Sequence, residues 1–366
     1  MYDARFPRTH GGTRPPRARA TAAPRTRMTE LLAIPELRAQ ALRRVLSPLL
    51  AARHVVLTTH VGADGDGSGS EAAVAAWLEG RGGRVSIVNP TPFPESFRFL
   101  LHRHDVVADL GTDAAREALA GADLFLVLDT SEPKRVGDLA PCLPHDRTVV
   151  VDHHPAGRAV VGALAVQDAE AAATGELVFD MVTLAGDELT PQIALGAYVA
   201  LVSDTGSFRY GNTTPRVHAI AADLMSRGID PEDVYRRLFA TAPRRRLDLL
   251  RDALGSLETD EVVPLAWMTV TGETARRYGA TAEDFDGLIE HVRSIEGTEV
   301  ALLFRETDDG QTKISFRSNG EADVNRLARE FGGGGHVKAA GALVPGRAAD
   351  VAPRVIDAAR GALIGA

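Results

Sequence analysis

The sequence contains one cysteine, no long apolar run and no internal repeat. Cys142 can form no internal disulfide, and it has no neighbouring cysteine with which to build a thiolate zinc site. No apolar segment approaches the roughly 18–20 residues that cross a bilayer, so a membrane span is excluded. We therefore expect a cytoplasmic protein.

The chain of 366 residues is too long for one ordinary hydrophobic core, which predicts two domains. Hydrophobic residues make up 45% of it and charged residues 25%, which favours a globular protein over wholesale disorder. The net charge is −8, and most of the positive charge is concentrated near the start. The acidic remainder argues against a broad cationic face for duplex DNA, so any nucleic-acid substrate should be small.

Residues 1–30 are predicted to form a disordered basic leader. Residues 1–27 contain seven arginines and one acid, Asp3, without an apolar period or the apolar core of a signal peptide. A nucleic-acid-binding arm or a transit peptide would share this composition. However, Met28 offers a second plausible start directly before the first helical pattern, so residues 1–27 need not be translated.

Short apolar runs then alternate with helical patterns, which predicts an α/β fold with a buried parallel sheet. Residues 215–257 have an entirely helical pattern, and strand patterns return after residue 264. We expect a large α/β domain over 31–241, a helical linker over 242–260 and a smaller α+β domain over 261–366. The expected strands of the first domain cover 55–59, 84–88, 124–128 and 148–151, and its expected helices cover 35–53, 70–79, 113–120, 174–184 and 191–201.

The first chemical motif is THVGADGDGSGS, which directly follows the apolar strand pattern at 55–59. Ligands of parallel α/β sheets bind beyond the carboxyl ends of strands, where His60, Asp64 and Asp66 are expected. Imidazole and carboxylate are suitable ligands for a divalent ion, and the glycines would let a loop fold back so that the three groups converge. An ordinary Asp-Gly turn explains DGDG alone, but not a histidine at the strand end as well.

Two further strands end in residues of the same kind, and an apolar helix ends in another. Asp129 closes LFLVLDTS, Asp152, His153 and His154 close TVVVDHHP, and Asp204 lies in LVSDTGSF. Each alone is more often structural than catalytic. Because one sheet edge would bring them together, they predict a site for two divalent ions about 3.5–4 Å apart, an arrangement that binds a phosphoryl group.

The last motif is FGGGGHVKAAG, preceded by SFRS. A glycine run usually marks a flexible loop, but this one lies between a helix pattern and a strand pattern. Exposed backbone N–H groups and nearby cations would bind an anion. The candidate substrate-binding residues are Arg317, Ser318, Gly333, Gly334, Gly335 and His336, with Lys338 as a further cation.

These motifs, in this order, resemble the DHH/DHHA1 phosphoesterase family, and the segment TGSFRYGNTT resembles its NrnA-type oligoribonucleases and 3′-phosphoadenosine-5′-phosphate (pAp) phosphatases. The likeness covers about residues 45–345. It implies a parallel-sheet DHH domain, a DHHA1 domain, an active site in the cleft between them and two Mn²⁺ ions. It assigns His60, Asp64 and Asp129 to one ion and Asp66, Asp129, His153 and Asp204 to the other, with Asp129 as the bridge. His154 would face the phosphate and Asp152 would orient a histidine, while Arg317, Ser318 and His336 would bind the far phosphate or base.

The resemblance implies two-metal hydroxide attack on short oligoribonucleotides and pAp, releasing nucleoside monophosphates, in a protein that is expected to be a homodimer. The nearest alternative is a phosphodiesterase for cyclic di-AMP or pApA, which would present the same bond. A manganese pyrophosphatase would have a different second domain, and a RecJ-type nuclease would have an added domain. A non-catalytic nucleotide-binding module should have lost metal ligands, and none of the expected ones is missing.

Overall fold

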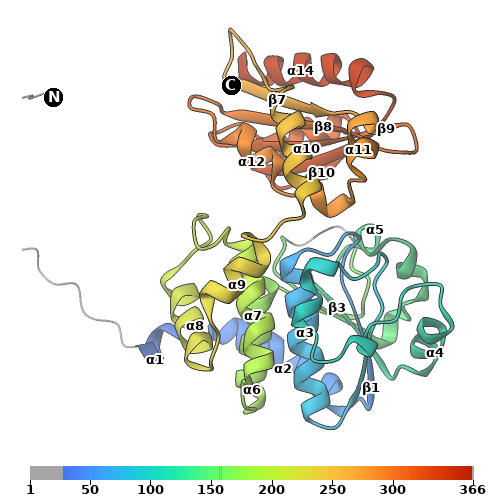
Figure 1. Cartoon of the computed structure of the whole chain (residues 1–366). Coiled ribbons are helices and arrows are strands. Elements are labelled where there is room, and N and C mark those ends of the chain that lie inside the picture. Colours follow the sequence, from blue (N-terminus) through green and yellow to red (C-terminus); the bar gives the residue numbers. More distant parts are fainter. Residues whose placement is uncertain (1–27, 156, 158, 365–366) are drawn as a thin grey trace, which may run out of the picture. The chain divides into compact units, whose positions relative to one another are not determined.

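The computed structural model describes residues 28–155, 157 and 159–364. The predicted leader therefore lies outside the described residues, except for its last three, which begin helix α1 (Met28–Leu31). The chain divides into two compact units, Met1–Pro231 and Glu232–Ala366, shown in Figure 1. The domain limits at 241 and 261 stay predictions.

The first unit has a parallel five-stranded sheet in the order β2-β1-β3-β4-β5. Four of its strands occur where the apolar runs predict them, and every residue of β1, β3 and β4 is buried, as expected for a sheet covered on both faces. The fifth strand was not predicted. The strands are β1 (His54–Thr58), β2 (Arg84–Ile87), β3 (Leu124–Leu128), β4 (Thr148–Asp152) and β5 (Leu164–Gln167).

Helices cover both faces of this sheet. One face packs on α4 and on residues 136–143 through a core that includes Val56, Phe125 and Val127. On the other side α3 and α7 lie against each other, as Figure 1 shows. The helices are α2 (Glu36–Ala51), α3 (Gly65–Gly80), α4 (Asp113–Gly121), α5 (Pro133–Val136), α6 (Thr174–Ala185), α7 (Pro191–Asp204), α8 (Pro215–Ser226) and, across the division between the units, α9 (Pro231–Leu238).

The second unit has a six-stranded sheet in the order β10-β11-β9-β8-β7-β6, with one parallel pair, β7 and β8. Helices α13 and α14 cover one face through a core that includes Phe304 and Phe316. Helices α10 and α12 cover the other through Leu303, Leu249 and Ile289. The strands are β6 (Glu258–Thr259), β7 (Leu265–Val270), β8 (Val300–Glu306), β9 (Gln311–Ser318), β10 (Gly334–Gly335) and β11 (Ala339–Pro345), and the helices are α10 (Arg244–Leu254), α11 (Gly272–Tyr278), α12 (Leu288–Arg293), α13 (Val324–Glu330) and α14 (Ala348–Ile364).

The segment that was expected to be a helical linker belongs to the second unit. Residues 215–257 form three helices, and the last of them, α10, buries Leu249 and Ala253 in the core beneath β7 and β8. Arg245 and Arg246 of this helix bond to Asp284 and to the backbone carbonyl of Asp286.

Candidate metal centre

The candidate ligands converge at the carboxyl edge of the first sheet. His60 follows β1, Asp129 directly follows β3, and Asp152 is the last residue of β4. In the order 2-1-3-4-5, strands β1 and β3 flank the point where successive connections pass to opposite faces of the sheet. Ligands of open α/β sheets bind beyond the carboxyl ends at such a point, so these side chains lie where a site is expected.

One group of three ligand atoms comes from His60, Asp64 and Asp129, which lie within 4.8 Å of one another. His60 Nε2 is 3.3 Å from Asp129 Oδ2 and 3.7 Å from Asp64 Oδ2. Nδ1 lies 3.1 Å from the carbonyl oxygen of Val61, to which it donates, so Nε2 is the nitrogen that faces the carboxylates. Although burial disfavours the charged ring, the two carboxylates raise the pKa of His60 to about 11.

A second group comes from Asp66, His153 and Asp204. His153 Nε2 is 3.0 Å from Asp204 Oδ2, 3.6 Å from Asp66 Oδ2 and 3.4 Å from Asp129 Oδ1. Burial disfavours the charged ring here too, but the carboxylates raise the pKa of His153 to about 10. The two oxygens of Asp129 thus face the two groups, one each.

Asp129 has a left-handed backbone, with φ of 61°. Its N–H donates to the carbonyl of Val151 on β4, 3.0 Å away, and its Oδ1 accepts from the hydroxyl of Thr174 at 3.0 Å. Aspartate and asparagine adopt this conformation more readily than bulky or β-branched residues do. The turn after β3 therefore fixes the carboxylate between His60 and His153.

His154 lies beside His153 and is oriented by Asp152. Asp152 Oδ1 accepts from the backbone N–H of His154 at 3.0 Å and lies 2.8 Å from its Nδ1. The same Nδ1 is 3.7 Å from Asp129 Oδ1. The sequence assigned Asp152 to the orientation of a histidine, and the structure brings it to His154.

Asp66 is held by the start of another helix. The prediction of a loop over DGDG is wrong: Asp64 caps α3, and Asp66 lies in its first turn. Asp66 accepts hydrogen bonds from the backbone N–H groups of Thr174 (2.6 Å) and Gly175 (2.9 Å), in the first turn of α6. Burial and the charges of Asp129 and Asp204 raise the pKa of Asp66 well above its ordinary value. An N-terminal turn stabilises the ionised carboxylate in this crowded position.

The glycines of this motif serve both the loop and the helix packing: Gly62 has a left-handed φ of 68° in the loop between His60 and Asp64, and Gly69 allows close helix packing. A Cβ on Gly69 would lie 2.5 Å from the carbonyl oxygen of Gly196, and a Cβ on Gly196 would lie 2.5 Å from that of Gly69. This contact brings α3 against α7, whose last residue is Asp204. The pair therefore fixes the spacing between Asp66 and Asp204.

Sequence reasoning missed the polar residues beneath His60. Asn89 Oδ1 accepts from the backbone N–H of Thr59 at 3.1 Å, and its Nδ2 donates to Glu71 Oε2 at 2.9 Å. Glu71 is fully buried, and burial raises its pKa to about 8. The two residues fix the end of β1 just before His60. The only signal in the sequence was a glutamate in an otherwise small and apolar helix.

The donor set fits divalent metal ions. Nε2 of His60 is buried without a hydrogen-bond partner in the part of the chain that is described, and it is aimed at two carboxylates. Imidazole and carboxylate together suit ions such as Mn²⁺ and Zn²⁺. Several buried carboxylates that repel one another are further reason to expect cations there.

Metal binding should release protons near neutral pH. Because the pKa values of His60 and His153 in the metal-free protein are about 11 and 10, both rings are protonated at pH 7, whereas a metal ligand must be neutral. The apparent affinity for Mn²⁺ should therefore fall as the pH is lowered, by up to about tenfold per histidine per pH unit. Calorimetric titrations at pH 7 in two buffers of different ionisation enthalpy measure the release, and equal heats in both would contradict it.

The substrate-binding candidates lie in the second unit, around β9 and β10. Arg317 lies on β9, and its Nε is 3.5 Å from Glu290 Oε1 on α12. Ser318 is buried, and its N–H donates to the carbonyl of Lys338. His336 is exposed, and its N–H donates to the carbonyl of Ala339.

The glycine run is ordered by its neighbours. The N–H groups of Gly332 and Gly333 donate to the last turn of α13, so they do not form the exposed row of donors that was expected. Gly334 and Gly335 pair with β11. A Cβ on Gly333 would lie 2.1 Å from the carbonyl oxygen of Gly341, so close backbone contact requires glycine there.

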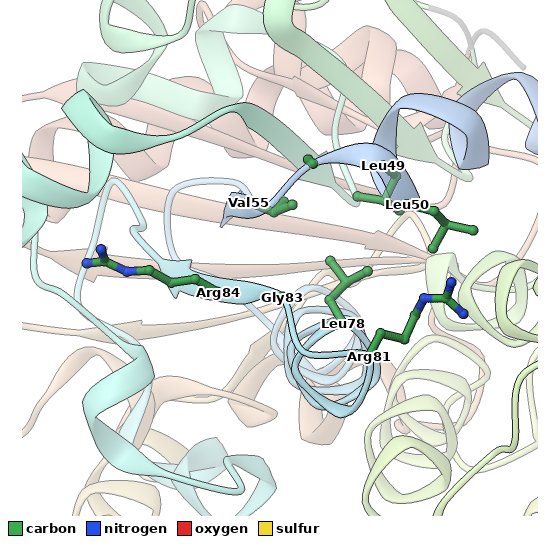
Figure 2. Close-up of a pocket in the computed structure, with 8 residues that line it drawn as sticks. Leu49, Leu50, Val55, Leu78, Arg81, Gly83 and Arg84 are labelled. Atoms are coloured by element: carbon green, nitrogen blue, oxygen red, sulfur yellow. The ribbon is translucent and has the colours of Figure 1, made fainter.

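A separate pocket of about 110 Å³ lies at the opposite, amino edge of the first sheet (Figure 2). It is bounded by the end of α2, the end of α3 and the starts of β1 and β2, including Leu49, Leu78 and Arg81. Arg81 is paired with Asp187 at 2.6 Å. None of the candidate ligands lines this pocket, so it is no part of the metal centre.

Two family models match the chain: the DHH family, N-terminal domain, over residues 54–201, and the DHHA1 domain over residues 266–364. All the candidate ligands except Asp204 fall in the first match, and all the candidate substrate-binding residues fall in the second.

Similar proteins include two that are named as bifunctional oligoribonuclease and PAP phosphatase NrnA. The one from Thermus thermophilus is 33% identical over 84% of this chain and 89% of its own length. The one from Bacillus subtilis is 28% identical over 79% of this chain and 89% of its own length. A solved structure of an exopolyphosphatase-related protein from Bacteroides fragilis is 25% identical, covers 91% of this chain and 97% of its own, and has a TM-score of 0.80.

Proposed function

The chain belongs to the DHH/DHHA1 family of phosphoesterases, and within that family we propose that it hydrolyses short oligoribonucleotides to nucleoside monophosphates and removes one phosphate from pAp. The observation that supports this best is the convergence of Asp129 with two histidine–carboxylate groups at one sheet edge. The NrnA relatives support the choice of substrates.

We assign His60, Asp64 and Asp129 to one ion and Asp66, Asp129, His153 and Asp204 to the other. When bound, the two ions would lower the pKa of a water molecule and offset the charge that develops on the phosphate. Manganese is our choice of ion.

His154 is assigned to the substrate phosphate. Nδ1–H of His154 donates to Asp152 Oδ1, which fixes the orientation of the ring and leaves Nε2 to face the phosphate. Attack of a water molecule on phosphorus forms one P–O bond and breaks the ester P–O bond. The leaving oxygen takes up a proton and departs as a hydroxyl group, so the products are a nucleoside monophosphate and the shortened chain, or inorganic phosphate when the substrate is pAp. Arg317, Ser318, His336 and the residues Gly333 to Gly335 would bind the substrate's far phosphate or base, so that short substrates with such a group are favoured.

Among the described residues, no helix is both long and apolar enough to cross a membrane. We further propose that the protein works in the cytoplasm as a homodimer. The single cysteine supports the cytoplasmic location, and the family resemblance supports the homodimer.

An activity panel tests the substrate assignment. With Mn²⁺, we expect the highest kcat/KM on pAp and on RNA of two to five nucleotides, and slower turnover of pApA and cyclic di-AMP measured side by side. EDTA should abolish all four activities, and added Mn²⁺ should restore them. Preference for cyclic di-AMP or pApA would instead assign the enzyme to second-messenger turnover, and activity on none of the four would overturn the proposed function.

A further inference from the structure

One face of the second sheet carries two cations that oppose each other on neighbouring strands. Arg305 on β8 and Lys313 on β9 are register partners in an antiparallel pair. Their neighbours Phe304 and Ile314 point into the core beneath α13 and α14. Because side chains alternate along a strand, Arg305 and Lys313 lie on the other face, the one that α10 and α12 partly cover.

The charges of this pair are not neutralised by an ion pair in the described part of the chain. The Arg305 guanidinium lies 4.5 Å from the ring centroid of Phe285, and Asp286 is the one acid that acts on both cations at longer range. Burial lowers the pKa of Lys313, and the neighbouring charge of Arg305 lowers it further. Like charges directly opposite each other destabilise a sheet, so a bound anion would stabilise this arrangement.

The pair lies on the same strand face as Arg317. Lys313, Ser315 and Arg317 alternate along β9, with Lys313 and Arg317 separated by about 13 Å along the strand. A third basic side chain, Arg246 of α10, donates to the backbone carbonyl of Asp286, the acid whose charge acts on both cations. Cations at these positions form a row along the strand, which suits a ligand with several phosphates better than a single small anion.

We propose that Arg305 and Lys313 form a phosphate subsite that binds the backbone of oligonucleotides too long to be held at Arg317 alone. This inference rests on the proposed function, and it concerns which lengths of RNA the enzyme prefers. pAp carries two phosphates, one to be cleaved and one for Arg317. Only a longer chain presents a further phosphodiester to the pair, so the subsite favours RNA over pAp.

The test compares Lys313→Gln with the parent enzyme on pAp and on 5′-phosphorylated RNA of two to eight nucleotides. The ratio of KM for the five-nucleotide RNA to KM for pAp should rise by about tenfold, the effect of one charge-assisted contact. The slope of log KM against log salt for that RNA should fall by about 0.7, the value per phosphate contact on a single strand. Lys313→Arg, which keeps the charge, should restore both values.

Arg354→Gln is the matched control, because Arg354 is an exposed cation on α14, which covers the opposite face of the sheet. It should leave the KM ratio and the salt slope unchanged. If Lys313→Gln changes neither quantity, or raises KM equally for pAp and RNA, the subsite is refuted while the proposed function stands. If the parent enzyme turns over neither substrate, the proposed function fails and the subsite falls with it.

Discussion

Replacing Asp129 by asparagine should lower kcat for pAp by on the order of 10²–10³-fold, the usual cost of removing one central electrostatic contact. Its two carboxylate oxygens lie 3.3 Å from His60 Nε2 and 3.4 Å from His153 Nε2, so one substitution weakens both groups of ligands. An amide has a single oxygen and no charge, and it cannot serve both.

The fold should tolerate this change. Asparagine accepts the φ of 61° at this position, and removing one charge relieves the repulsion that raises the pKa of Asp66. The variant also loses the attraction of Asp129 to the protonated rings of His60 and His153, which opposes this gain. The unfolding temperature of the metal-free variant should therefore stay close to that of the parent, whereas the rise in unfolding temperature on adding Mn²⁺ should shrink. Metal content, thermal unfolding and Mn²⁺-dependent turnover measure the three effects.

The matched control is Asp146→Asn, an exposed aspartate just before β4, which should behave as the parent does. Near-normal turnover of the Asp129→Asn protein with two bound metals per chain would show that Asp129 does not bridge them.

Replacing Arg317 by alanine should lower kcat/KM for pAp and dinucleotides by about one to two orders of magnitude. The change removes a charge-assisted contact worth about 1.5–3 kcal/mol. An activated ester such as bis-p-nitrophenyl phosphate has no distal phosphate to present, so its turnover should change little. Comparing kcat/KM for the two kinds of substrate measures the difference.

The control for this variant is a substitution of Arg293, which contacts the same carboxylate, that of Glu290. This carboxylate is 3.5 Å from Arg317 Nε and 2.9 Å from Arg293 Nε, so either arginine can be removed while the other remains. Arg293→Ala should affect both kinds of substrate little. Equal losses on both substrates in the Arg317→Ala protein would mean that Arg317 serves the chemical step or the fold, and its assignment to the distal phosphate would be wrong.

The sequence predicted the strand-end residues well because buried parallel strands are easy to locate in a sequence. Continuous apolar runs mark buried strands, and their carboxyl ends meet at one edge, so His60, Asp129 and Asp152 could be brought together without coordinates. The family motifs named the same residues independently. Strand β5 was missed because its apolar run is only three residues long, Leu164 to Val166, and three of its four residues are only partly buried.

The local environment of each ligand could not be predicted. The donors that hold Asp66 are backbone groups of Thr174 and Gly175, more than 100 residues away, and a backbone N–H leaves no mark in the sequence. The start of α3 was also misplaced, because glycine-rich DGDGSGS has low helix propensity and tertiary packing overrides it. Likewise, nothing in SFRS indicated that Glu290 would face Arg317.

The glycine contact between α3 and α7 restricts how this enzyme can change over evolution. A side chain larger than hydrogen at Gly69 or Gly196 would push the two helices apart, and Asp66 and Asp204 would move with them. The distance between these two carboxylates therefore depends on the packing of the two helices, and it cannot change unless that packing changes. New substrate preferences should arise from substitutions in the second unit, where the surface of β9 can vary without disturbing the metal ligands.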